Sequence, residues 1–303
     1  MARAIEGLSK IHHHPSVTRN ILMHPQDKAH IRYLDIKTRP QMPGKILAAT
    51  NIHPDEPFLS AILPRVINER LNDQNSHDVP NMLFIHESTP SGVAIRDSGY
   101  PFFNEDLKVL MEAYGLSHDE AMAQYGYQLP RTNINGHDLN RSFLNMGDDP
   151  EAWLHHHLVA QNGPIPAGFY FHNDEELVGP KGKAIYIYIH GNRQDPFPEE
   201  FIERYRVAMR KNGFLLFNGL DDKSEPELGN RVEEGVVRTF TDEKDEKNEP
   251  KYASSLENNM VDKGIMRWAF TLEFPVTDKT TLRKMTEVVI DNLVFPVGTS
   301  LLQ

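Results

Sequence analysis

The sequence contains no cysteine, and this absence limits the chemistry that the protein can perform. Neither a disulfide framework nor a thiolate nucleophile can form, and no metal ion can be held by sulfur from cysteine. Any catalytic metal must therefore be bound by histidine, aspartate or glutamate.

The sequence also lacks a surplus of basic residues and long apolar runs. It has 32 Lys and Arg against 43 Asp and Glu in 303 residues, a formal net charge of -11. Nucleic-acid binders need basic residues to contact phosphates, so we expect no nucleic-acid partner. No apolar run is long enough to cross a bilayer, and residues 1–20 lack the apolar centre of a secretory signal. We therefore expect a cytoplasmic protein with no membrane partner, whose oligomeric state is open.

Short apolar runs rich in β-branched and aromatic residues predict buried strands. These runs are "KILAAT" (45–50), "NMLFIHE" (81–87), "AIYIYIH" (184–190), "GFLLFN" (213–218) and "RWAFTLEF" (267–274). Apolar residues at helical spacing follow in 58–67 and 282–293. The pattern predicts a single-domain α/β fold, with a mixed, mostly parallel twisted sheet covered by helices on both faces.

Histidines stand at the ends of two predicted strands. His53 comes shortly after "KILAAT", with Glu56 where the next helix should begin, and His190 ends "AIYIYIH". Ligands of open α/β sheets bind beyond the carboxyl ends of the strands. Two histidines and a glutamate would leave an open position on Zn²⁺, as in catalytic rather than structural sites. The alternative is that His53 and Glu56 are ordinary surface residues near a helix start.

The segment "RTNINGHDLNRSF", residues 131–143, concentrates polar residues in a glycine-containing turn region. A guanidinium group matches a carboxylate, and a neighbouring amide adds further donors. Asn140 and Arg141 therefore form a candidate anion clamp. The alternative is a structural turn in which Arg141 pairs with a surface carboxylate.

Glu273 lies in "RWAFTLEFP", where alternation puts Thr271 and Glu273 on one face of the predicted strand. A carboxylate in an otherwise apolar strand is either paired with a cation or positioned for catalysis. Beside a zinc-bound water, Glu273 would act as the general base.

Taken in chain order, these residues resemble the zinc carboxypeptidases of the carboxypeptidase A type, over Lys45 to Pro275. In that family a His-x-x-Glu pair and a later histidine bind zinc. The resemblance implies that His53, Glu56 and His190 hold one Zn²⁺ per chain. It also implies an N-terminal segment over residues 1–40 and a catalytic domain over residues 41–303.

The segment 131–143 is similar to the central motif of the family. By this similarity Arg131 stabilises the oxyanion, and Asn140 and Arg141 hold the terminal carboxylate of the substrate. Asp138 supports His53 as a hydrogen-bond partner, which metal-bound histidines commonly need.

The segment "TLEFP" resembles the strand that carries the catalytic glutamate of the family, which assigns that role to Glu273. Upstream, Tyr252 is the candidate for the tyrosine that closes over the substrate, with an offset of one residue. Glu257, Asn258 and Asn259 stand where the family lines its specificity pocket, and they suggest a polar pocket for a basic or amide-bearing side chain.

The chain departs from the family in two short motifs. Residues 89–92 read Thr-Pro-Ser-Gly where many members have Asn-Pro-Asp-Gly, and the first ligand motif, residues 53–56, reads His-Pro-Asp-Glu. Neither histidine cluster is assigned a function. Residues 12–14 are expected to be exposed to solvent, and at residues 155–157 consecutive helical positions cannot all face one ion.

The resemblance implies a zinc metallocarboxypeptidase that hydrolyses the amide bond next to a free C-terminal carboxylate of a peptide. One alternative is a zinc deacylase of N-acyl amino acids, similar to aspartoacylase or succinylglutamate desuccinylase. Another is an inactive relic that binds carboxylate ligands. Whether residues 104–130 or 241–251 border the active site is open.

Overall fold

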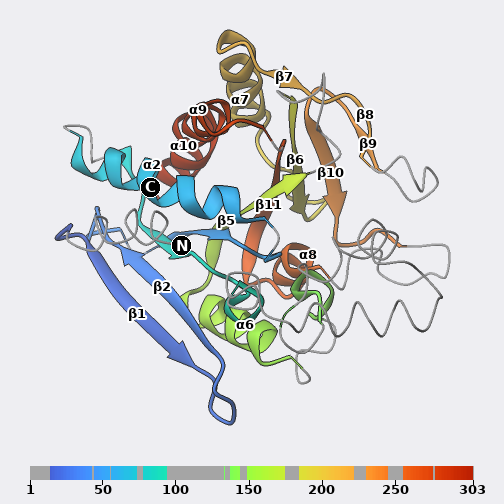
Figure 1. Cartoon of the computed structure of the whole chain (residues 1–303). Coiled ribbons are helices and arrows are strands. Elements are labelled where there is room, and N and C mark those ends of the chain that lie inside the picture. Colours follow the sequence, from blue (N-terminus) through green and yellow to red (C-terminus); the bar gives the residue numbers. More distant parts are fainter. Residues whose placement is uncertain are drawn as a thin grey trace, which may run out of the picture.

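The protein is described here by a computed structural model. The described residues are 14–42, 44–54, 56–73, 78–93, 133, 137–143, 149–174, 184–221, 230–244, 255–275 and 277–302. In this part of the chain the helices and strands form one α/β unit (Figure 1).

The main sheet has the strand order β1-β2-β4-β3-β5-β11-β6-β10, and β7 extends it beside β6. The strands are β1 (Val17–Met23), β2 (His30–Ile36), β3 (Ile46–Thr50), β4 (Met82–Ile85), β5 (Ile165–Asp174), β6 (Ala184–Gly191), β7 (Leu215–Leu216), β10 (Val236–Phe240) and β11 (Met266–Pro275). A small separate pair joins β8 (Gly219–Leu220) to β9 (Arg231–Val232).

Strand direction changes three times across this sheet, between β1 and β2, between β2 and β4, and between β11 and β6. β4, β3, β5 and β11 run parallel to one another, whereas β6 runs antiparallel to β11. At the other side, β1 and β2 form an antiparallel hairpin at the edge, and β2 is antiparallel to β4. The mixed, mostly parallel sheet predicted from the sequence is therefore confirmed.

Helices cover both faces of the sheet (Figure 1). The helical segments are α2 (Pro57–Asn72), the 3-10 turn η3 (Leu139–Arg141), α6 (Pro150–Asn162), α7 (Glu199–Lys211), α8 (Leu256–Asp262), α9 (Lys279–Val289), the π-helical turn η6 (Ile290–Val294) and α10 (Phe295–Leu301). α2 and α10 pack on β5, with α7 and α9 beside them, whereas α6 packs on β2 and α8 on β11 and β6. Among the described helices, none has both the length and the apolar character that crossing a bilayer requires.

Alternation along the central strands gives the two faces different chemistry. On the face toward α2 and α9, Phe169, Phe171, Phe270, Leu272 and Phe274 belong to the largest apolar cluster. On the face toward α8, the residues between them are polar or hydroxyl-bearing: Tyr170, His172, Thr271 and Glu273. One face of these strands therefore packs into the largest apolar cluster, whereas the other face carries candidate functional side chains beside a second, smaller apolar cluster.

The predicted strands at 45–50, 81–87, 184–190 and 267–274 correspond to β3, β4, β6 and β11. The run at 213–218 forms only the two-residue strand β7, and β5 was not predicted. The N-terminal hairpin of β1 and β2 is part of the main sheet. The proposed division at residue 40 stays a prediction.

Candidate metal centre

The turn between β3 and α2 brings His53 and Glu56 together. Asn51 adopts a left-handed backbone conformation with φ of 52°, which asparagine tolerates better than most residues. The chain then turns so that the backbone N–H of Glu56 donates to the carbonyl of His53 at 3.2 Å. From the segment after β4, the hydroxyl of Thr89 donates to the carbonyl of Ile52 at 2.6 Å. The altered motif at residues 89–92 thus retains a structural contact to this turn.

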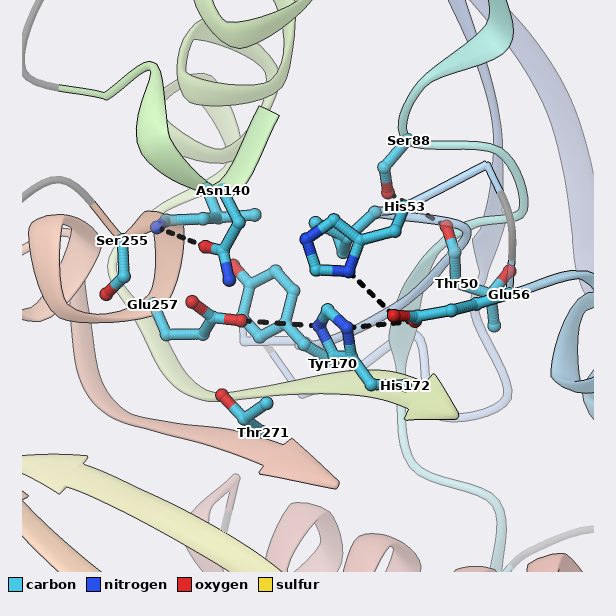
Figure 2. A network of polar contacts seen from close by, with 12 residues as sticks. Thr50, His53, Glu56, Ser88, Asn140, Tyr170, His172, Ser255, Glu257 and Thr271 are labelled. Atoms are coloured by element: carbon cyan, nitrogen blue, oxygen red, sulfur yellow. Dashed lines mark hydrogen bonds and ion pairs between the residues drawn. The ribbon is translucent and has the colours of Figure 1, made fainter. Parts of the chain in front are cut away.

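Three buried side chains converge at the carboxyl ends of β3 and β5: His53, Glu56 and His172 (Figure 2). Nδ1 of His53 lies 2.7 Å from Oε1 of Glu56, and Nδ1 of His172 lies 3.0 Å from Oε2 of the same carboxylate. One potential ligand atom from each residue lies within 4.8 Å of the others. Two imidazoles and a carboxylate are a donor set that suits Zn²⁺.

The carboxylate between the two histidines is strongly stabilised in its ionised form. Burial alone would raise the pKa of Glu56, but the charges and hydrogen bonds of His172 and His53 outweigh burial and lower the pKa. Burial alone would lower the pKa of His172, but Glu56, Glu257 and Glu273 together raise it. The site therefore concentrates negative charge around His172, which suits a bound cation.

Glu273 is the direct neighbour of His172 in the sheet. In the parallel pairing of β5 and β11, Glu273 stands opposite His172, and Thr271 stands opposite Tyr170. Residues opposite each other in adjacent strands project from the same face of a sheet. Glu273 therefore projects from the face that carries the candidate metal ligand His172.

The structure does not bring His190 to this group. β6 runs antiparallel to β11, and His190 stands opposite Ala269, four residues before Glu273. Four residues of strand span about 13 Å, so the two side chains lie far apart along the strand direction. The His190 ring lies between two threonines, with Nδ1 2.5 Å from the Thr239 hydroxyl and Nε2 3.1 Å from the Thr271 hydroxyl. Among the described residues, the third member of the group is His172, which the sequence analysis missed.

The turn at residues 137–143 places Asp138 behind His53. Oδ1 of Asp138 lies 3.3 Å from Nε2 of His53 and accepts a hydrogen bond of 2.8 Å from the backbone N–H of Asn140. The side-chain oxygen of Asn140 accepts from the backbone N–H of Leu256 at 2.9 Å, which leaves its NH₂ group available as a donor. Arg141 is exposed, and its Nη1 donates to the Asn140 carbonyl at 3.0 Å.

Two predicted site residues, Arg131 and Tyr252, lie outside the described residues, and their roles stay predictions. The segment 104–130 also lies outside them, as does the part of the charge run from residue 245 onward.

Comparison with known proteins identifies the fold. No protein-family model matches the sequence, and no curated relative matches it. Among solved structures, a candidate metallopeptidase from Shewanella amazonensis is 15% identical with a TM-score of 0.62, over 97% of this chain and 91% of that one. A metallo-carboxypeptidase from Pseudomonas aeruginosa, in complex with (2-guanidinoethylmercapto)succinic acid, is 15% identical with a TM-score of 0.61, over 100% of this chain and 69% of that one.

Carboxypeptidase A from Helicoverpa armigera is more distant, at 14% identity and a TM-score of 0.53 over 98% of this chain and 71% of that one. The fold is therefore the one shared by these metallopeptidases and metallo-carboxypeptidases, as the sequence resemblance implies. Within it, His53, Glu56 and His172 form a group that could hold a metal ion.

Proposed function

We propose that this protein is a metal-dependent hydrolase of the metallocarboxypeptidase type, which cleaves the amide bond next to a free C-terminal carboxylate. The observation that carries the proposal is the convergence of His53, Glu56 and His172, with Glu273 on the neighbouring strand and the same face. The metallo-carboxypeptidase fold of the solved structures supports it.

In this proposal the metal ligands are His53, Glu56 and His172, so that His172 takes the place expected for His190. Zn²⁺ fits the donor set, and when bound it would lower the pKa of its water and polarise the substrate carbonyl. Glu273 would accept the proton of that water and deliver a proton to the leaving amine. Its strand position next to His172 supports this role.

The turn at 138–141 would select the substrate. The guanidinium of Arg141 is exposed and the Asn140 amide is oriented by Leu256, so both can offer N–H donors to a terminal carboxylate. Arg131 would stabilise the oxyanion and Tyr252 would cover the substrate, as the sequence resemblance implies. The ligand of the Pseudomonas protein is named as a succinic acid, so a carboxylate-bearing ligand is compatible with this fold.

The test is hydrolysis of matched peptides by the zinc-loaded protein. Peptides with a free C-terminus and the same peptides with an amidated end are incubated with it, and released residues are measured by mass spectrometry. We expect release from the free ends with a preference of about 10- to 100-fold, because hydrogen bonds to a charged group contribute about 1.5–3 kcal/mol.

Three other results would contradict the proposal in different ways. Equal cleavage of peptides with free and amidated ends would show that Asn140 and Arg141 do not recognise the terminal carboxylate. Hydrolysis of N-acyl amino acids but not of peptides would identify a deacylase instead. No hydrolysis of either substrate by protein with bound zinc would indicate a binding protein without activity.

A further inference from the structure

Each histidine of the proposed metal site faces a second carboxylate with its outer nitrogen. Both Nδ1 atoms face Glu56. On the other side of the rings, Nε2 of His53 lies 3.3 Å from Oδ1 of Asp138, and Nε2 of His172 lies 3.6 Å from Oε1 of Glu257. The two histidines are thus held in the same way, although Asp138 precedes the 3-10 turn η3 and Glu257 lies in α8. Figure 2 shows Glu257 facing His172.

His172 and Glu257 contact each other through two buried polar atoms. Both residues are 1% exposed. Within the described part of the chain, neither Nε2 of His172 nor Oε1 of Glu257 has a hydrogen-bond partner, and their separation is that of an ion pair rather than of a hydrogen bond. A small movement of either side chain would make a hydrogen bond between them. A buried carboxylate without a partner destabilises the folded protein, and pairing with His172 would offset this free-energy cost for Glu257.

The turn that carries Asp138 also positions Glu257. Asp138 accepts from the backbone N–H of Asn140, and the side chain of Asn140 accepts from the backbone N–H of Leu256, the residue before Glu257. At the same helix end, the hydroxyl of Ser255 accepts from the backbone N–H of Asn258 at 3.2 Å. The start of α8 is therefore fixed relative to the turn, and the two carboxylates are placed by one connected set of hydrogen bonds.

We propose that Glu257 is a positioning residue for the metal ligand His172. In the metal-bound protein its carboxylate accepts the Nε2–H of His172, which fixes the tautomer and the ring orientation and leaves the Nδ1 lone pair for the metal. The inference rests on the proposed metal site. It gives Glu257 a different role from the side-chain recognition expected from the sequence.

The test measures zinc affinity of the purified chain by competition with a chromophoric chelator. We expect Glu257→Ala to weaken zinc binding by about 10- to 100-fold, the usual effect of removing such a partner. Glu257→Gln keeps an acceptor oxygen without the charge and should bind zinc with intermediate affinity. The matched control is Glu151→Gln, since Glu151 is also a buried carboxylate but accepts from the backbone N–H of Ser91 and not from a histidine. This control should bind zinc like the native protein.

A second readout follows the proton itself. In zinc-loaded protein with ¹⁵N-labelled histidine, we expect the Nε2–H of His172 to give a downfield signal that exchanges slowly with water. Glu257→Gln should shift this signal, and Glu257→Ala should lose it. Circular dichroism establishes that the variants are folded; if the alanine variant is not, the glutamine variant and the proton signal decide.

The outcomes separate this inference from the proposed function. If the native protein binds no zinc, the proposed function fails and the role of Glu257 fails with it. If zinc binds but the Glu257 variants have native affinity and an unchanged His172 signal, the positioning role alone is overturned. A change in side-chain preference among peptides with native zinc affinity would assign Glu257 to substrate recognition instead.

Discussion

Alternate residues of β5 and β11 project from opposite faces of the sheet, and the two faces differ in chemistry. Phe171 and Leu272 point into the apolar cluster under α2 and α9. Their chain neighbours His172 and Glu273 project from the other face, beside α8. Since a strand alternates its side chains, a buried strand can hold the core and present reactive groups at the same time. Rigid packing on one face thereby fixes the geometry on the other.

The polar face contains a second comparison, between His172 and His190. Both histidines lie near the end of an apolar strand and both are buried, but β5 and β6 run in opposite directions relative to β11. His172 therefore reaches the edge where His53 and Glu56 lie. His190 lies between the threonines Thr239 and Thr271, and burial lowers its pKa to about 4 despite the charge of Glu257. The direction of the strand, rather than the type of residue, therefore determines which of the two histidines lies beside His53 and Glu56.

The largest effect should come from exchanging His172 for alanine, with His190→Ala as the matched comparison. His172→Ala should weaken zinc binding by more than about 100-fold, because it removes a ligand rather than a supporting partner. His190→Ala should keep native zinc affinity and instead lose about 1–3 kcal/mol of stability, as two buried threonine contacts disappear. Isothermal titration calorimetry with zinc measures the zinc affinity of each variant, and urea denaturation measures its stability. Loss of zinc in the His190 variant alone would restore the ligand set expected from the sequence.

The sequence alone predicts two of the three members of the candidate metal site. The local pair His53 and Glu56 could be predicted, because a turn of four residues brings an i, i+3 pair together without knowledge of the sheet. The third member of the proposed metal site, His172, could not be predicted in this way, because its position depends on the order and direction of strands far apart in the chain. The run "AGFYFH", residues 167–172, ends in a histidine just as "AIYIYIH" does, and it is the feature of the sequence that points to His172.

The next largest effect should be seen at Glu273 on the polar face. Glu273→Gln keeps the size of the side chain but removes its ability to take a proton, so kcat should fall by about 10²- to 10⁴-fold. Zinc content, measured by mass spectrometry of the metal, should stay at the native level. A variant that turns over peptides at the native rate would exclude Glu273 as the general base.

The neighbouring residue on the apolar face tests the other half of the comparison. Leu272→Ala should lower the free energy of unfolding by about 2–5 kcal/mol, because it leaves a cavity among buried side chains. The folded fraction should keep native zinc affinity, since Leu272 points away from the proposed metal ligands. Urea denaturation and zinc titration at low temperature measure the two effects. A large loss of zinc affinity with little loss of stability would contradict the separation of the faces.

The smallest effect concerns two buried carboxylates on helices of the polar face, Glu151 in α6 and Glu257 in α8. Burial raises the pKa of Glu151 to about 7; burial would also raise that of Glu257, but contact with His172 lowers it to about 2. Because folded Glu151 holds its proton more tightly than the unfolded chain, native stability should fall between pH 4.5 and about 7. Glu151→Gln removes this term, so urea denaturation should show the variant gaining about 2–3 kcal/mol over the native protein from pH 4.5 to pH 8. A constant difference between the two proteins across this range would show that Glu151 is ionised in the folded protein throughout, and that burial without a cationic partner does not by itself neutralise a carboxylate on this face.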